Sequence, residues 1–278
     1  MGHSSRHAER DRGLPEERRK LLETLSADLS DDHSILAVYL GGSLAEGTSD
    51  LYSDIDLRVV VEPGAYDVFV ADKLRRPRRW GDVLFFEDGG PGVSHTVAHF
   101  ACFVKVDVFY YQPGDLRPSL FMKSIRIVHD PLQMVDKVQN ESRQLAYAVS
   151  RGEFERWQGK VLAHLHETYR GVMRDELSYA LQMMTGLAGW IMRGWHMEAG
   201  RPPDLWADWP KAEGARSALA HWQVSLLGAW HCRRDPDEIM KTVASMVPEL
   251  LRLNHALSRL AGAAEDRELW AQAIGMVL

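Results

Sequence analysis

Residues 34–62 read SILAVYLGGSLAEGTSDLYSDIDLRVVVE, two apolar runs joined by a short polar stretch. The first run, residues 34–40, is short, branched and apolar and stops at two glycines, which predicts a buried strand. The second, residues 54–62, is also rich in β-branched residues and stops before a proline, which predicts another strand. The SLAEG segment between the two runs predicts a brief helix.

Asp54 and Asp56 stand two positions apart in the second run. Side chains at positions i and i+2 of a strand point to the same face, so we expect the two carboxylates to project together. Carboxylates this close repel each other unless a cation lies between them. Mg²⁺ is the natural occupant, because it is a hard ion that takes carboxylate oxygens and substrate phosphates as ligands. Asp107, in the run KVDVFYY, is a third candidate ligand, since three converging carboxylates are enough to hold two metals for in-line displacement at phosphorus.

The glycines that end the first run suit a phosphate-binding turn. A strand that ends in Gly-Gly lets the backbone pass close to a ligand, and Ser43 begins the predicted short helix, whose free N–H groups favour an anion. Phosphate at Gly42 and Ser43 beside metal at Asp54 and Asp56 predicts a nucleoside triphosphate held for attack at its α-phosphorus. The motif GxxxxGK[ST] does not occur in the sequence, so this is not a P-loop.

The rest of the chain changes its pattern near residue 130. Before that point, apolar runs alternate with turn signals and predict helices at 15–29 and 65–76 and further strands at 80–87, 100–111 and 124–130. After it, long stretches carry helical periodicity and β-branched runs disappear. We therefore predict an α+β chain with a mixed-sheet domain over residues 1–135 and an all-helical C-terminal domain over residues 136–278.

The composition is that of an ordinary globular protein, with 45% hydrophobic and 26% charged residues in a chain of 278. A formal net charge of −6 argues against nonspecific nucleic-acid binding but is compatible with a cationic small substrate. The sequence has two cysteines and no apolar stretch near the ~18 residues of a membrane helix. Its N-terminal segment lacks the features of a signal peptide or a myristoylation site. We therefore expect a cytoplasmic protein with no membrane partner. We expect a monomer or a homodimer.

These elements together resemble the signature of the DNA polymerase β-like nucleotidyltransferase superfamily. GGSLAEGTSDLYSDIDLRVVV followed by VKVDVFY contains an apolar strand that ends in Gly-Ser, an Asp-x-Asp about ten residues later, and a third acidic residue on a later strand. A helical C-terminal region behind such a core resembles the bacterial antibiotic nucleotidyltransferases, which adenylylate aminoglycosides or lincosamides. The resemblance implies that residues 1–135 form a nucleotidyltransferase core.

The resemblance implies transfer of a nucleoside monophosphate, most simply AMP from ATP, onto a hydroxyl of a small molecule, with release of pyrophosphate. It implies that Asp54 and Asp56 are Mg²⁺ ligands and that Asp107 is either a third ligand or the base that takes the hydroxyl proton. It also implies that Gly42 and Ser43 hold the β- and γ-phosphates.

The same resemblance directs attention to the helical region, which in antibiotic-modifying relatives closes over the acceptor and lends acidic residues to cationic substrates. The acidic candidates here are Glu167, Asp175 and Glu176, and an aminoglycoside-like acceptor is the corresponding expectation. Asp175 and Glu176 have an ordinary alternative role in offsetting a helix dipole. Lys160 is a candidate phosphate contact, and Arg58, which has the parity of the two carboxylates in its strand, is a candidate to pair with a carboxylate or a phosphate.

Two other functions stay open at this point. One is a nucleotidyltransferase that modifies a protein acceptor, as in the small enzymes that act on a partner toxin. The other is a nucleotide-binding regulatory module without turnover. A fused helical domain favours a built-in acceptor site over the first of these, and the second stays open.

Overall fold

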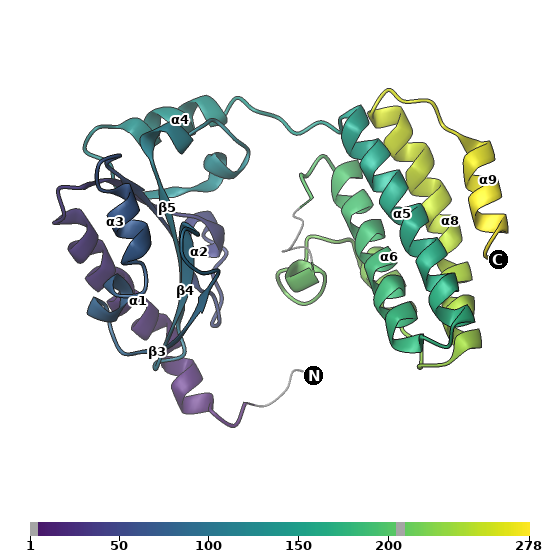
Figure 1. Ribbon diagram of the computed structural model, residues 1–278, viewed down its shortest axis with the longest axis horizontal. Helices are drawn as coiled ribbons and strands as arrows, with labels where there is room; N and C mark the ends of the chain where they lie inside the picture. The colour runs from purple at the N-terminus through teal and green to yellow at the C-terminus, as the bar shows by residue number, and fades with distance from the viewer. Residues whose placement is uncertain (1–4, 204–208) are drawn as a thin grey trace. The chain divides into compact units, whose positions relative to one another are not determined.

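The computed structural model describes residues 5–203 and 209–278. The chain divides after Ala146 into two compact units, which are shown in Figure 1. The first unit contains a six-stranded sheet of order β3-β4-β5-β2-β1-β6. Its strands are β1 (Ile35–Leu40), β2 (Ile55–Val61), β3 (Val83–Asp88), β4 (His95–Phe100), β5 (Lys105–Tyr111) and β6 (Arg126–His129). Strands β2 and β5 run parallel and all other neighbours are antiparallel, so the sheet is mixed as predicted.

Helices cover both faces of this sheet. The helices of the first unit are α1 (Ala8–Ser30), α2 (Gly42–Glu46), α3 (Tyr66–Ala71) and α4 (Met134–Ser142), and its 3₁₀ helices are η1 (Arg76–Arg79), η2 (Pro113–Asp115) and η3 (Phe121–Ser124). On one face, leucines of α1 pack with Ile55, Leu57 and Val59 of β2 in the larger core, and α3 lies along this face (Figure 1). Because strand side chains alternate, Asp56 and Arg58 point to the opposite face.

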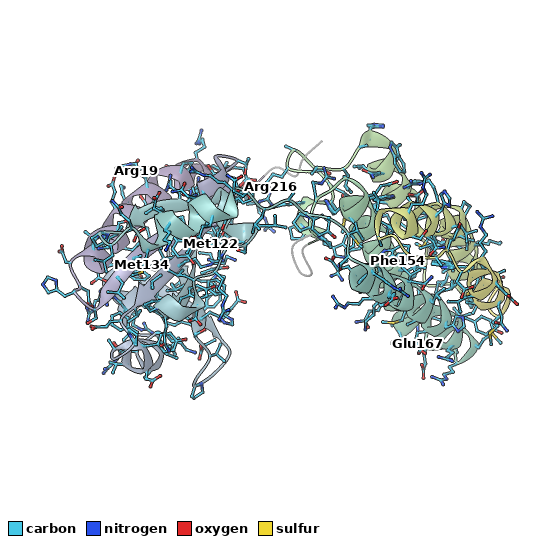
Figure 2. All side chains as sticks on the ribbon, turned by 90° about the horizontal axis from the view of Figure 1, so that it is seen from above. Arg19, Met122, Met134, Phe154, Glu167 and Arg216 are labelled. Carbon is cyan, nitrogen blue, oxygen red and sulfur yellow. The ribbon has the colours of Figure 1, made fainter. Side chains whose placement is uncertain are left out.

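The opposite face carries a smaller core in which α4 and η3 pack on β1 and β2. Met122 of η3 and Met134 of α4 belong to this cluster, as Figure 2 shows, and Val135 is fully buried in it. Helix α4 therefore belongs to the sheet unit, and the chain divides after it. The division predicted between residues 135 and 136 falls inside α4, because helical periodicity begins in this helix although it still packs on the sheet.

The run 100–111 differs from its prediction as one strand. Phe100 ends β4, the chain turns through Phe103 at a positive φ of 68°, and Lys105 begins β5. The residues SHTVAHF, which the pattern had not marked as a strand, supply β4. The long apolar run hides the turn because Phe103 is a bulky residue in a left-handed conformation, where glycine is the usual signal.

The second unit is all helical, as predicted. Its helices are α5 (Arg151–Met173), α6 (Leu177–Glu198), α7 (His221–Ala229), α8 (Pro236–Leu260) and α9 (Arg267–Gly275), with the 3₁₀ helix η4 (Trp209–Lys211). Figure 1 shows α5, α6 and α8 running alongside one another, and Trp157, Trp195 and Trp270 are buried in their common core. Among the described residues, no helix is long and apolar enough to cross a membrane.

Candidate functional site

The register of the parallel pair β2–β5 brings the three aspartates together. Asp56 lies directly beside Asp107, and Ile55 lies beside Val106, so Asp54, one residue earlier, comes next to Lys105. Alternation puts Asp56, Lys105 and Asp107 on the same face of the sheet, away from the core that α1 covers. The three carboxylates predicted from distant parts of the sequence thus meet at one end of two adjacent strands.

Asp54, Asp56 and Asp107 are called the carboxylate row below. The glycine turn after β1 lies directly against this row. Gly41 N–H donates to the Asp56 carbonyl at 2.9 Å, and Gly42 has a φ of +60°, in the left-handed region. A Cβ at Gly42 would lie 2.0 Å from Asp56 Oδ2 and 2.9 Å from its Cγ. Only glycine permits both this backbone conformation and this approach. Ser43 follows in α2, so the proposed phosphate turn and the Asp-x-Asp pair are neighbours in space.

Lys105 lies between two of the carboxylates. Its Nζ is 2.9 Å from Asp54 Oδ2 and 3.2 Å from both oxygens of Asp107. It is two residues before Asp107 in β5, so strand parity puts both side chains on one face. Sequence reasoning missed this lysine, although the spacing KVD was the signal that could have found it.

Arg18 of α1 holds the loop that leads into Asp54. Its buried guanidinium donates to the carbonyls of Asp50 at 3.1 Å and Ser53 at 2.8 Å. Ser53 Oγ in turn accepts from the Asp50 N–H at 2.8 Å. These bonds fix the backbone on the N-terminal side of β2, so the position of Asp54 does not depend on the strand alone.

Arg58 is held by aromatic rings rather than left free to reach a ligand. Its guanidinium lies 4.0 Å from the Phe109 ring centroid and 5.2 Å from that of Phe121. Its Nη1 is 4.0 Å from Asp56 Oδ1, and the arginine side chain is 12% exposed. Stacking and the nearby carboxylate fix this cation beside Asp56, two residues further along β2, where it partly offsets the charge of Asp56.

Burial and mutual repulsion shift the protonation of the site. Burial raises the pKa of Asp56, and the negative charge of Asp54 raises that pKa further. Burial also raises the pKa of Asp107, although the ammonium of Lys105 works in the opposite direction. Both aspartates are therefore easier to protonate than exposed ones, chiefly because burial disfavours their charged forms.

Carboxylate oxygens are suitable ligands for a divalent metal, but in this structure the side chains of Asp54 and Asp107 are arranged around Lys105. Within residues 5–203 and 209–278, no group of three or more His, Cys, Asp or Glu side chains is arranged to hold a metal ion. Asp107 Oδ1 is nevertheless buried and accepts no hydrogen bond there, lying 3.2 Å from Lys105 Nζ outside hydrogen-bond geometry. This oxygen is buried without a hydrogen-bond donor and lies next to two more carboxylates. Such a group of oxygens provides the ligands that a hard cation takes.

A pocket of about 280 Å³ adjoins the row on the side away from the glycine turn. Asp54 and Lys105 form part of its wall, whereas Gly42 and Asp56 do not line it. Three aromatic side chains that line this pocket are largely exposed, at 58, 54 and 59% of their area: Tyr52, Phe85 and Phe103. Sequence reasoning missed these aromatics, because they come from three separate segments that only the fold brings together.

The candidates of the second unit lie on α5 and at the turn into α6. Lys160 is exposed on α5, and Asp175 and Glu176 are exposed in the turn, where Asp175 has a φ of 57°. Glu167, labelled in Figure 2, pairs with Arg170 and accepts a hydrogen bond from the Tyr179 hydroxyl at 3.1 Å. These hydrogen bonds lower the pKa of Glu167, which keeps its carboxylate charged.

A different part of this unit forms a pocket of about 430 Å³. His164, Trp190 and Trp209 are among the residues that line it. Gly186 and Gly189 leave room for two of these rings, since a Cβ would lie 2.5 Å from the His164 ring and 3.1 Å from Trp209 Nε1. None of the predicted acidic residues is in the described lining.

A model of a known protein family matches part of the first unit. Residues 19–87 match the nucleotidyltransferase domain. This segment contains the glycine turn, Asp54 and Asp56, and it ends before β5. The chain therefore contains a nucleotidyltransferase domain, and it resembles the polymerase β-like enzymes in the residues already described. A search of curated proteins finds no significant match.

Solved structures with a similar course of the chain include further nucleotidyltransferases. An aminoglycoside 6-adenyltransferase from Bacillus subtilis is 12% identical, with 93% of this chain and 97% of that chain covered and a TM-score of 0.42. A nucleotidyltransferase-like protein from Exiguobacterium sibiricum is 10% identical over 87% and 77% of the two chains, with a TM-score of 0.43. The CD-NTase CdnG from Bradyrhizobium diazoefficiens, in complex with GTP, is 12% identical over 95% and 93%, with a TM-score of 0.29.

Proposed function

We propose that this nucleotidyltransferase moves AMP from ATP onto a hydroxyl of a small molecule and releases pyrophosphate. The observation that carries the proposal is the contact of the Gly42 turn with Asp56, in the same row as Asp54 and Asp107. A turn suited to phosphate and a row of carboxylates suited to Mg²⁺ are the two features that reaction at an α-phosphorus requires.

Asp54, Asp56 and Asp107 are the residues that would hold Mg²⁺, and Gly42 and Ser43 would hold the β- and γ-phosphates. When bound, Mg²⁺ supplies stabilisation of the charge that develops on the phosphate oxygens. The acceptor oxygen bonds to the α-phosphorus, the bond from that phosphorus to the bridging oxygen breaks, and pyrophosphate carries the electron pair away. The alternative role proposed for Asp107, in place of that of third ligand, is to take the proton of the attacking hydroxyl.

The pocket beside Asp54 is where we propose that the acceptor binds. In-line displacement requires the attacking oxygen to approach the phosphorus from the side opposite to the leaving group. The pyrophosphate leaves on the side of the Gly42 turn, and the pocket opens at the other end of the carboxylate row. Its exposed aromatic rings suit the apolar face of a sugar ring, which packs well against an aromatic surface.

An aminoglycoside-like antibiotic is the acceptor class that we propose. Such a molecule combines sugar rings with hydroxyls and cationic amines. The rings suit the aromatic pocket. Glu167, Asp175 and Glu176 are proposed as acceptor-binding residues on the ground of their charge alone. Lys160 is proposed as a phosphate contact. Arg58, whose Nη1 lies 4.0 Å from Asp56 Oδ1, is proposed to pair with that carboxylate.

The test is acceptor-dependent release of pyrophosphate. Purified protein with MgATP is incubated with a panel of aminoglycosides and lincosamides, and other nucleoside triphosphates are then substituted for ATP. We expect at least one acceptor to stimulate release and to gain the mass of AMP. Mg²⁺-dependent ATP binding without release for any small acceptor would contradict the proposed acceptor and favour a protein acceptor or a binding module.

Replacing Phe103 by asparagine is expected to separate acceptor binding from folding. Phe103 is 59% exposed and has a φ of 68°, which costs a bulky residue about 1–2 kcal/mol. Asparagine tolerates this conformation better, which offsets loss of the contact between the ring and the Arg10 guanidinium, 4.0 Å from its centroid, so the melting temperature should change little. Loss of the ring should raise the KM for the acceptor roughly tenfold.

Steady-state kinetics against both substrates would check this result. The KM for ATP should change little, because the pocket lies on the acceptor side of the row. Leu132→Ala removes another exposed apolar side chain from the same unit and should leave both KM values unchanged. A Phe103→Asn enzyme whose ATP KM rises instead would place the nucleobase in this pocket and contradict its acceptor role.

A further inference from the structure

Lys105 occupies the position between carboxylates that a metal ion would need. Its ammonium contacts Asp54 Oδ2 at 2.9 Å and both Asp107 oxygens at 3.2 Å. These are oxygens that a divalent cation would take at about 2.0–2.1 Å if it were Mg²⁺. Each of these oxygens can bind either the ammonium or the metal ion. The two cations cannot both lie between Asp54 and Asp107, because they would repel each other strongly.

The lysine is held firmly in this position. Its ammonium pairs with carboxylates from two segments, Asp54 immediately before β2 and Asp107 in β5, so contacts on two sides hold it. The side chains of Lys105, Asp54 and Asp107 are 34, 33 and 18% exposed, so solvent screens their attraction only in part. Lys105 thus neutralises one of the three negative charges in the row.

We propose that Lys105 is a built-in competitor of the divalent metal, whose ammonium holds Asp54 and Asp107 in the metal-free protein and leaves them when the metal binds. The inference rests on the proposed metal role of the carboxylates. It predicts weak metal binding by the nucleotide-free protein, because each binding event must first break the lysine contacts. Triphosphate oxygens, as additional ligands, would then be needed for tight binding.

The position of Lys105 also determines where the displaced ammonium can go. Its backbone is fixed in β5, and its side chain already lines the aromatic pocket. Release from the carboxylates therefore leaves the positive charge at the wall of that pocket. The charge of the acceptor side of the site is thereby coupled to metal binding.

The experiment measures binding of Mn²⁺ alone to the full chain without nucleotide, from the electron paramagnetic resonance signal of the free ion. Lys105→Met should bind Mn²⁺ about tenfold to a hundredfold more tightly than the natural protein, since hydrogen bonds between charged groups no longer compete. Lys105→Arg keeps the charge and should bind no more tightly than the natural protein. Lys20→Met removes the same charge from an exposed ion pair on α1 with Glu17 and should leave Mn²⁺ affinity unchanged.

Thermal denaturation provides a second measurement. In EDTA, Lys105→Met should melt several degrees lower than the natural protein, because the carboxylates are left without their cation, and Mn²⁺ should raise its melting temperature by more than that of the natural protein. Should Lys105→Met prove unfolded, Lys105→Gln takes its place in both measurements.

The outcomes separate this inference from the proposed function. If the natural protein binds Mn²⁺, Asp56→Asn abolishes that binding, and Lys105→Met binds no more tightly than Lys20→Met, the role of Lys105 is refuted and the metal site stands. If neither the natural protein nor Lys105→Met binds Mn²⁺ at millimolar concentration, the metal site itself and the role of Lys105 are both refuted.

Discussion

Asp56→Asn is expected to lower the rate of nucleotidyl transfer at least about 10³-fold while making the metal-free protein more stable. The rate falls because asparagine removes a negative ligand from the proposed metal row, and metal stabilisation of the transition state is worth several kcal/mol. Stability rises because burial and the charge of Asp54 raise the pKa of Asp56, so its ionised form is disfavoured in the folded chain.

The pH dependence follows from the direction of that shift. Below the ordinary aspartate pKa of about 4, Asp56 is protonated in both the folded and the unfolded chain and costs nothing. As the pH rises through the raised pKa of the folded state, the unfavourable charge appears. The advantage of Asp56→Asn in EDTA should therefore be larger at pH 7.5 than at lower pH and should vanish below about pH 4.

Pyrophosphate release and thermal denaturation in EDTA would measure the two effects. Asp67→Asn makes the same change of charge at an exposed position of α3 and should alter neither quantity. A variant that loses activity and also melts lower than the natural protein in EDTA would mean that Asp56 supports the fold, contrary to this account.

Gly42→Ala is expected to lower the rate of transfer more than about a hundredfold and to destabilise the fold by roughly 2–4 kcal/mol. The added Cβ would lie 2.0 Å from Asp56 Oδ2, so either the turn or the carboxylate must move. Displacement of a reacting group by about 1 Å can cost a hundredfold in rate. The positive φ and the overpacking both contribute to the loss of stability.

Gly47→Ala is the matched control for this substitution. Gly47 ends α2 with a φ of 72°, and a Cβ there meets nothing within 4 Å. It should cost about 1–2 kcal/mol through its backbone alone and leave most of the activity. Equal losses of activity in the two variants would show that the contact with Asp56 is not what matters at Gly42.

The sequence was sufficient where the signal is local. Strand alternation places Asp54 and Asp56 on one face, and the helical periodicity after residue 130 indicates an all-helical unit; both follow from the geometry of a single element. The turn at Phe103 is also local, but its signal was absent, because a phenylalanine stands where glycine is expected. The apolar run 100–111 therefore read as one strand.

Only the tertiary structure decided which segments lie side by side. The sequence alone does not specify that β5 pairs parallel to β2 rather than with β1, yet this pairing sets Asp107 beside Asp56 and Lys105 between the carboxylates. The aromatic pocket likewise depends on three separated segments meeting at one edge. Side-chain direction is fixed by the backbone of each strand, whereas strand partners are chosen by the burial of the whole sheet. The local sequence therefore determines which side chains share a face, and the packing of the whole sheet determines which of them lie close together in the site.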